Sequence, residues 1–402
     1  MTAPVLTTRD RLNAFLDHPE VAVDSATAGP LAGLTLGVKD IFDVAGYVSG
    51  WGNPDRFAEA KPAVATAPAV QKLLDAGARF IGKTQTEELA FSMIGQNVHF
   101  PRPVNPAAPD RVTGGSSSGS AAAVAGGLAD IGTGSDTGGS VRAPASFCGL
   151  MGLRTTHGLI SLEGTMPLAP SFDTFGWFAR DAEIYERVGE VLLGGRIEAA
   201  EKPRLISLPA LDELVSGPAE ATAYGRMKRT AEGVLGPVHA AKQPPFSIDE
   251  LYWATRKLQA REAWAAHGEW ISVEGRRIGQ AIHDRFAFGK TVSAADVAAE
   301  TKKRDAFRAA FANLLGNDGI LVLPTVPCAA PKAASTAEEL GAFRERAIRL
   351  LCWSGLSGFP QISLPLGQVD SAPFGISLLG PAGSDLALIR LGRRVLESAG
   401  RG

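Results

Sequence analysis

Two glycine- and serine-rich loops hold the residue types best suited to nucleophilic chemistry. The first, Gly114–Ser120, reads GGSSSGS and runs into an alanine-rich stretch. Three adjacent serines between glycines suit neither a core nor a helix interior, whereas such a loop allows close backbone approach to a bound group and presents hydroxyls to it. A flexible surface loop or a plain helix N-cap would show the same letters, so both interpretations stay open.

The second loop, Gly132–Arg142, reads GTGSDTGGSVR and places Gly138 and Gly139 directly before Ser140. Successive backbone N–H groups at such a turn form a nest that binds an oxyanion. A serine at this point has its oxygen beside the N–H groups that would hold a developing negative charge. An ordinary glycine-rich β-turn is the alternative interpretation.

Other glycine-rich signatures fit these loops poorly. A P-loop requires lysine after its second glycine, but Ser120 follows Gly119. The second loop begins like a dinucleotide fingerprint, yet Thr137 replaces its third glycine. The first loop also fails the G-x-S-x-G pattern of a nucleophile elbow, and no serine is followed three residues later by lysine.

A serine nucleophile requires a base, and Lys39 is the most interesting candidate. Lys39 ends the apolar segment LAGLTLGVK and precedes Asp40. A lysine that enters a low-dielectric site has a lowered pKa and can act as a neutral base near pH 7. Spacing alone favours the competing interpretation, a surface lysine at a strand end. His157 is the nearest histidine and lies in no recognisable triad context.

Alternating strand and helix patterns must position these loops. Strands are predicted at 31–39, 79–83, 128–133, 204–208, 319–324, 361–366 and 374–379. Helices are predicted at 67–76, 86–93, 116–125, 184–193, 342–353 and 384–399, and residues from about 217 to 315 read mainly as helix. This alternation predicts an α/β fold with a mixed β-sheet core covered by helices on both faces. No linker is evident, so we expect a single domain over residues 1–402.

The composition excludes several classes of protein. Forty Lys and Arg against 42 Asp and Glu, a net charge of −2, give no electrostatic footprint for nucleic acid or for a membrane surface. No run of 18 apolar residues and no signal-peptide pattern occurs. Three cysteines without a Cys-x-x-Cys pair favour a reducing compartment, and we expect a cytoplasmic protein. Six scattered histidines form no ligand motif, so we expect neither metal nor cofactor. The oligomeric state stays open, a homo-oligomer included.

The stretch from Thr113 to Arg154 closely resembles the signature of the amidase signature family. It contains TGGSSSGSAAAVAGG and then DIGTGSDTGGSVRAPASFCGLMGLR. The likeness extends upstream through GVKDIFDVAG and GKTQTEELAFSMIGQN, and downstream through SFDTFGWFARD, LVLPTVP and SGFPQISLPLG. It is weakest over residues 200–315, and Ser118 stands at a position where glycine is usual. The resemblance implies the α/β amidase signature fold.

The resemblance also implies a Ser–cis-Ser–Lys triad made of Ser140, Ser116 and Lys39, with a cis Gly115–Ser116 peptide bond. Neutral Lys39 would accept a proton from Ser116, which relays one from Ser140, and Ser140 would attack the amide carbonyl to form an acyl-enzyme. The oxyanion hole would consist of the backbone N–H groups of Thr137, Gly138, Gly139 and Ser140. The residues expected to brace the loops are Ser117, Asp136 and Arg142.

Within the family, the chain is similar to short plant-type indole-3-acetamide hydrolases through KDIFDVAGYVSGWGNPD and the triple-serine loop. This implies hydrolysis of an aryl or arylacetic primary amide to a carboxylic acid and ammonia. The residues that could line an apolar pocket are Met93, Phe147, Phe172, Phe175 and Trp177, although core packing accounts for each taken singly. An aliphatic amide, carbamate or biuret-type hydrolase, or the amidase subunit of an amidotransferase, is the alternative within the family. The alternative outside the family is an anion- or nucleotide-binding protein. The presence of all three triad residues argues against this alternative.

Overall fold

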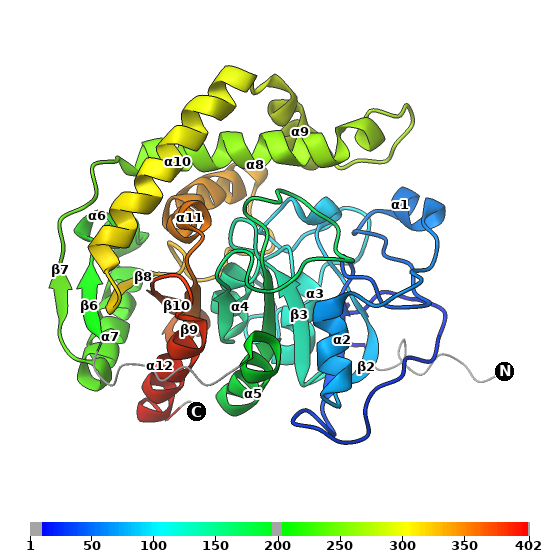
Figure 1. Cartoon of the computed structure of the whole chain (residues 1–402), viewed down its shortest axis with the longest axis horizontal. Helices are drawn as coiled ribbons and strands as arrows, with labels where there is room; N and C mark the ends of the chain where they lie inside the picture. Colours follow the sequence, from blue (N-terminus) through cyan, green and yellow to red (C-terminus); the bar gives the residue numbers. More distant parts are fainter. Residues whose placement is uncertain (1–9, 195–202, 401–402) are drawn as a thin grey trace.

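The computed structural model describes residues 10–194 and 203–400 (Figure 1). Its first sheet has the strand order β2-β1-β3-β5. These strands are β1 (Thr35–Lys39), β2 (Arg79–Thr84), β3 (Ile131–Ser135) and β5 (Phe175–Ala179). Strand β1 runs parallel to β2 and β3, and β5 is antiparallel to β3. The carboxyl ends of β1 and β3 therefore lie at the same edge of this sheet.

The second sheet has the order β4-β9-β10-β8-β6-β7. Its strands are β4 (Gly152–Arg154), β6 (Arg204–Ser207), β7 (Val238–Ala240), β8 (Gly319–Pro324), β9 (Gln361–Val369) and β10 (Ala372–Leu379). Parallel pairs (β6 with β7 and β8) and antiparallel pairs (β10 with β8 and β9) both occur. The two sheets meet where Thr155, just after β4, donates a hydrogen bond to the carbonyl of Phe175 in β5.

Helices cover both sides of these sheets, which confirms the predicted fold class (Figure 1). The shorter helices are α1 (Pro54–Glu59), α2 (Pro68–Asp75), α3 (Ser118–Ala125), α4 (Arg142–Cys148), α5 (Ala182–Leu193), α6 (Pro209–Asp212), α9 (Gln280–Thr291) and α12 (Asp385–Ser398). The longer ones are α7 (Gly217–Leu235), α8 (Ile248–Ile271), α10 (Ala294–Leu315) and α11 (Ala337–Ser357). In Figure 1, α8, α9 and α10 form a layer along one side, whereas α2, α5 and α12 lie on the other.

Capping boxes begin three of the long helices. Ser247 caps α8, Ser293 caps α10 and Thr336 caps α11, and in each case an acidic side chain three residues later reaches back to the cap. This pairing satisfies backbone N–H groups that would otherwise lack an acceptor. The box at Thr336 also explains why α11 begins at Ala337, five residues before the predicted start at 342.

The helix predicted over residues 86–93 is wrong. The structure has only a short 3-10 turn, η1 (Glu88–Ala90), in which Leu89 and Ala90 have positive φ angles of 48° and 53°. Glu87 accepts hydrogen bonds from the backbone of Gly95 and Gln96. The carboxylate thus stabilises a turn rather than the first turn of a helix.

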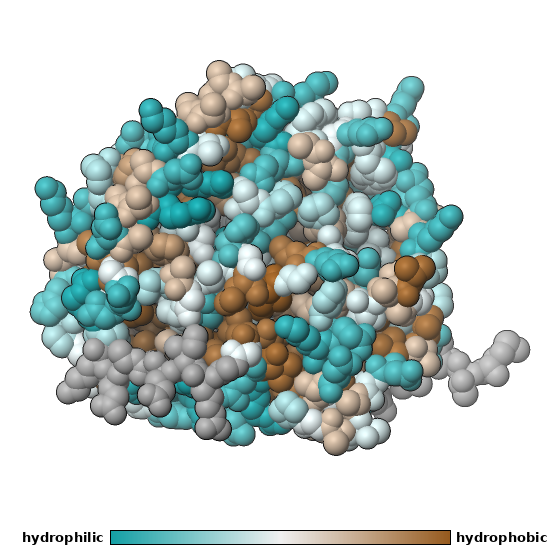
Figure 2. All heavy atoms as spheres, viewed as in Figure 1, coloured by the Kyte–Doolittle hydropathy of each residue, from teal (hydrophilic) through white to brown (hydrophobic). Residues whose placement is uncertain are grey.

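Buried apolar side chains from Leu31 to Leu396 form one continuous cluster that contacts both sheets. A smaller cluster packs α3 against α4, β3 and β5. On the face shown in Figure 2, hydrophilic residues cover most of the periphery, and hydrophobic residues gather near the middle. No helix within residues 10–194 and 203–400 is long and apolar enough to cross a membrane.

Candidate active site

Lys39 and Ser116 meet at the carboxyl edge of the first sheet. Lys39 is the last residue of β1, and its backbone N–H donates to the hydroxyl of Thr133 in β3 at 2.9 Å. Its Nζ lies 2.7 Å from Oγ of Ser116, which stands just before α3. The Gly115–Ser116 peptide bond is cis, as the resemblance implies. The structure therefore brings together two residues that are 77 positions apart in the sequence.

The amine of Lys39 is buried and contacts hydroxyl groups. Its side chain is fully buried, so the surface-lysine interpretation is wrong. Besides Ser116, its Nζ contacts the hydroxyls of Ser135 at 2.8 Å and Ser117 at 3.1 Å. Within the described residues no carboxylate forms an ion pair with it. Desolvation lowers the pKa of Lys39 to about 7, against the opposing effects of Asp136, Asp173 and Glu87.

Asp40, the neighbour of Lys39 in the chain, points away from this site. Its carboxylate accepts a hydrogen bond from Gly50 and lies 3.4 Å from Nζ of Lys83. Successive side chains of an extended segment point to opposite faces, which separates Asp40 from the amine of Lys39. This geometry leaves Lys39 without the acid that would keep it protonated.

Ser140 lies in the turn between β3 and α4, with 5% of its surface exposed. Across the described part of the chain its hydroxyl forms no hydrogen bond, and none joins it to Ser116. The side chain lines a small pocket together with Thr137, Gly138 and Met93. The hydroxyl is therefore presented to a ligand in that pocket rather than engaged by the protein.

Of the four backbone amides expected to form the oxyanion nest, one is already engaged within the protein. The N–H of Gly139 already donates to Oδ1 of Asp136 at 2.9 Å. In residues 10–194 and 203–400 the backbone amides of Thr137, Gly138 and Ser140 have no acceptor. Gly139 has a φ of +124°, and a Cβ there would lie 2.5 Å from a methyl group of Leu351, so the turn requires glycine. The structure thus offers three free donors where four were expected.

Asp136 braces the turn that carries Ser140. Its buried carboxylate accepts from Nε and Nη2 of Arg142 at 2.9 and 2.8 Å, and from the backbone N–H of Val141. Arg154 forms a second buried ion pair with it at 3.2 Å. Burial alone would raise the pKa of Asp136, but the two guanidinium groups hold it below its usual range. Sequence reasoning placed Asp136 and Arg142 here and assigned no role to Arg154.

Ser117 also lies where a supporting residue was expected. Its hydroxyl contacts Nζ of Lys39 and accepts from the backbone N–H of Ser135 at 3.3 Å. Ser135 itself, at the end of β3, is a contact of Lys39 that the motif did not indicate. The alternation of side chains along the strand puts the hydroxyls of Thr133 and Ser135 on one face, and this signal could have revealed it.

Only one of the five expected pocket residues lines the pocket of Ser140, namely Met93. The other four are fully buried in the core. Phe147 packs on Phe343, Phe175 packs on Phe42, Trp177 stacks on Tyr185, and Phe172 lies under the guanidinium of Arg304. Strand β5 is covered on both faces, so its aromatic side chains have no open space to line.

Residues from α8 and α11 complete the pocket instead. Its walls are Ala90, Phe91, Ser92, Met93, Thr137, Gly138, Ser140, Leu168, Gln259, Arg344 and Ile348. A neighbouring cavity of about 290 Å³ shares Ala90, Thr137 and Leu168 with it and reaches Ser135. Sequence reasoning missed Gln259, Arg344 and Ile348, because no local motif marks these positions.

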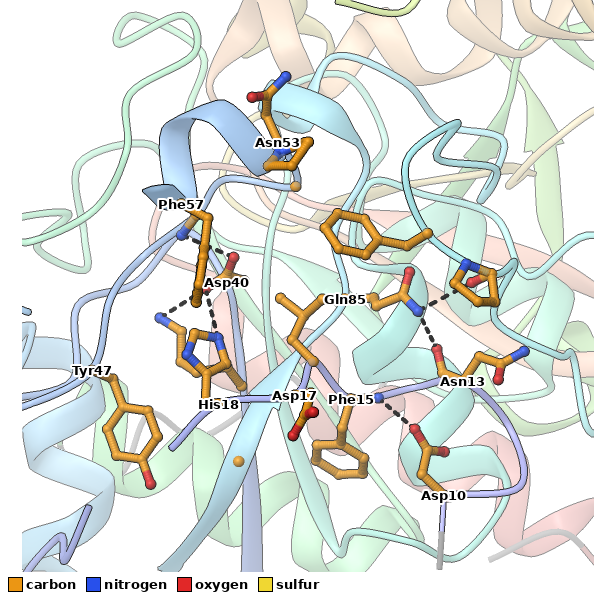
Figure 3. Close-up of a pocket in the computed structure, with 18 of the residues that line it drawn as sticks. Asp10, Asn13, Phe15, Asp17, His18, Asp40, Tyr47, Asn53, Phe57 and Gln85 are labelled. Atoms are coloured by element: carbon orange, nitrogen blue, oxygen red, sulfur yellow. Dashed lines mark hydrogen bonds and ion pairs between the residues drawn. The ribbon is translucent and has the colours of Figure 1, made fainter. Parts of the chain in front are cut away.

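A separate cavity of about 440 Å³ is lined by residues of β2 and α1, among others (Figure 3). Its walls include Phe15, His18, Asp40 and Phe57, and Figure 3 shows His18 and Phe57 beside Asp40. Burial raises the pKa of Asp40 to about 6, against the effect of Lys83. None of the triad residues borders this cavity, so it is distinct from the site that contains Ser140.

Comparison with known proteins places this fold and site in a family. The family model described as Amidase matches residues 15–221. "Amidase 1" of Oryza sativa subsp. japonica is 40% identical over 413 residues, covering 95% of this chain and 94% of that protein. "Amidase 1" of Arabidopsis thaliana is 38% identical over 417 residues, covering 96% and 98%. A solved amidase crystal structure superposes with a TM-score of 0.83 at 28% identity, covering 92% of this chain and 85% of that chain.

The chain therefore belongs to the amidase signature family. The reaction of the family is hydrolysis of the C–N bond of an amide, and the expectation of an amidase is confirmed at that level. The likeness to the plant proteins named Amidase 1 is confirmed as well.

Proposed function

We propose that this chain is a serine amidase that acts through an acyl-enzyme. The observation that carries the proposal is the 2.7 Å contact between Nζ of Lys39 and Oγ of Ser116, formed by a buried lysine without a carboxylate partner. With a pKa of about 7, the amine of Lys39 is substantially neutral at physiological pH. It can accept the proton of Ser116, which in turn takes the proton of Ser140 as that oxygen attacks the amide carbonyl.

The same groups serve the rest of the cycle. The unpartnered amides of Thr137, Gly138 and Ser140 would stabilise the tetrahedral oxyanion. Protons returned through Ser116 would then protonate the leaving nitrogen, and ammonia departs. Water, activated through the same relay, would cleave the ester on Ser140 and release the carboxylic acid. Every step uses only side chains, backbone amides and water, so we propose no cofactor and no metal.

We propose a small aryl or arylacetic primary amide as the substrate. Phe91, Met93, Leu168 and Ile348 give the pocket of Ser140 apolar walls, and the neighbouring cavity of about 290 Å³ has the room that an aromatic ring needs. Similarity to the plant proteins named Amidase 1 supports an amide as the substrate. Measurement of ammonia release from a panel of amides tests this class. The panel includes aryl amides as well as aliphatic amides, carbamates and biuret-type compounds, because hydrolysis of the latter three classes alone would replace the aryl assignment.

We further propose a cytoplasmic location. Cys148, Cys328 and Cys352 are all free thiols, two of them buried, which suits a reducing compartment. Thiol counting on protein isolated from its native host under alkylating conditions tests this. Three alkylated cysteines are expected, and a recovered disulfide would contradict the location.

Covalent labelling tests the proposed nucleophile. A fluorophosphonate should modify Ser140, and Ser140→Ala should abolish labelling and lower kcat by roughly 10⁴-fold or more, since the acyl-enzyme can no longer form. Ser118→Ala is the matched control, because Ser118 belongs to the neighbouring serine loop and has no assigned role. It should keep both labelling and ammonia release. Undiminished turnover by Ser140→Ala would sink the assignment.

A further inference from the structure

Three arginines from three helices converge beside the pocket of Ser140. Arg256 comes from α8, Arg285 from α9 and Arg344 from α11, and all three line one small cavity. Arg344 also lines the pocket that contains Ser140. The cluster, Arg256, Arg285 and Arg344, therefore borders the place where the substrate must lie.

None of the three guanidinium groups forms an ion pair within the described residues. Arg285 donates to the backbone carbonyl of Phe91 at 2.6 Å, and Arg256 donates to the hydroxyl of Tyr252 at 2.7 Å. Nε of Arg344 is buried and has no hydrogen-bond partner. The three side chains are partly buried, whereas Arg142, which is fully buried, is paired with Asp136. The cluster thus gathers three guanidinium groups around one cavity without a carboxylate that pairs with any of them.

This arrangement is costly unless an anion completes it. A buried cation without a counter-charge loses hydration that nothing replaces, and neighbouring like charges add repulsion. Burial, reinforced by Arg285 and Arg256, lowers the pKa of Arg344 well below its ordinary value. A guanidinium matches the geometry of a carboxylate with two parallel hydrogen bonds, which would satisfy the unpartnered Nε.

The cluster is also tied to the catalytic turn. Gln259, one turn after Arg256 on α8, donates to the backbone carbonyl of Thr137 at 2.9 Å. Gln259 lines both the cavity of the arginines and the pocket of Ser140. Arg344 lines both cavities as well, so a ligand held at Ser140 lies next to its guanidinium.

We infer that the acyl part of the substrate carries a carboxylate, which Arg344 binds while Arg256 and Arg285 add positive potential. The substrate class is then the monoamide of a dicarboxylic acid, aromatic members included, with its amide at Ser140. This inference rests on the proposed amidase function. It adds a charge requirement to that function and names Arg344 as the residue that sets it.

Matched substrate pairs test the charge requirement. Succinamate is compared with 4-oxopentanamide, and 4-carbamoylbenzoate with 4-acetylbenzamide, by ammonia release. In each pair, the first compound carries a carboxylate where the second carries a methyl ketone of similar shape. The wild-type enzyme should prefer at least one carboxylate over its ketone by about 10- to 100-fold in kcat/KM, the range expected for a charged hydrogen-bonded pair. Equal rates or a preference for both ketones would overturn the inference.

Variants locate the requirement at Arg344. Arg344→Met should remove the preference, mainly through KM, while leaving the thermal midpoint unchanged or higher, because it removes an unpaired buried charge. Arg344→Lys should keep part of the preference. Arg346→Gln is the matched control, since Arg346 is an exposed residue of the same helix, and it should behave as wild type. An unchanged preference in both Arg344 variants would overturn the assignment.

A binding readout separates this inference from the proposed function. Succinate or terephthalate should slow fluorophosphonate labelling of Ser140 in the wild type and not in Arg344→Met. If Ser140 is labelled and neutral amides are hydrolysed but neither dianion protects, the amidase stands and the carboxylate site fails. If Ser140 is not labelled at all and no amide is hydrolysed, the proposed function itself fails.

Discussion

At the scale of single residues, Lys39 and Lys83 show how partners decide what a buried lysine can do. Both side chains are fully buried, and burial lowers the pKa of each. Lys83 lies 3.4 Å from Asp40, which favours its charged form. Lys39 contacts only hydroxyls, which accept a hydrogen bond without fixing a proton on the amine. With a pKa of about 7, Lys39 can gain or lose its proton near neutral pH.

The proposed base predicts a particular pH profile. The amine of Lys39 is protonated below a pKa of about 7 and inactive as a base there. The value of kcat/KM should therefore rise about tenfold per pH unit below 7 and level off above about pH 8. Initial rates from pH 5 to 9 measure this. A flat profile across pH 6–8 would contradict the role.

Substitution of Lys39 gives the complementary prediction. Lys39→Ala should lose roughly 10³-fold or more in kcat/KM, and Lys39→Arg should not rescue it, because a guanidinium does not deprotonate. Lys72→Arg, on the exposed side of α2, is the control and should be fully active. Circular dichroism should show that each variant is folded. An active Lys39→Arg enzyme would mean that Lys39 supplies only charge or packing.

At the scale of elements, the turn between β3 and α4 is held by charge rather than by regular structure. Asp136 closes it by accepting from the backbone of Gly139 and Val141 and from two buried arginines. Arg142 is the first residue of α4, so the ion pair also fixes the start of that helix. The turn orients Ser140 and the free amides around it.

Removal of this carboxylate should therefore damage both stability and rate. Asp136→Asn leaves Arg142 and Arg154 buried without a counter-charge, and we expect a loss of about 3–5 kcal/mol in the free energy of unfolding. The value of kcat should fall more steeply than KM rises, because the oxyanion donors are displaced. Urea titration and steady-state kinetics measure the two effects. Asp110→Asn, which breaks the exposed ion pair with Lys332, is the control and should leave the midpoint unchanged. A stable, fully active Asp136→Asn would show that the turn does not depend on the carboxylate.

At the scale of the whole molecule, the site draws on parts of the chain that lie far apart. Lys39 ends β1 of the first sheet and Ser140 lies in the turn after β3, whereas Gln259 and Arg344 come from helices that follow later in the chain. Contacts of α8 with α9, α10 and α11 hold the arginine-bearing helices over the catalytic edge (Figure 1). In the proposed function, one part of the molecule thus supplies the reactive groups and another part recognises the substrate.

The whole site also predicts independence from metal ions. No group of three or more His, Cys, Asp or Glu side chains that could hold a metal ion occurs in residues 10–194 and 203–400. Ammonia release should therefore be unchanged after dialysis against EDTA. Activity lost on dialysis and restored by a divalent cation would contradict this.

The sequence by itself determined the reactive core of this protein. The resemblance of the two glycine-serine loops and of the GVKD segment to the amidase signature implied residues that the structure places at one edge of a sheet, and it implied the cis bond at Ser116. Spacing alone had favoured a surface lysine at position 39. The α/β fold with helices on both faces also followed, because hydrophobic periodicity is a local signal. Such features depend on neighbours in the chain, so a linear pattern carries them.

Only the tertiary structure decided which residues surround the reactive groups. Phe175 and Trp177 had the chemistry of pocket residues, but packing on both faces of β5 buried them. Nothing in the local sequence distinguishes Arg344 from an ordinary surface arginine. In the folded chain, α8 and α9 place two further arginines beside it. Burial and the absence of a counter-charge are properties of groups brought together from distant parts of the chain. A local pattern cannot encode them, and here they shape the pocket.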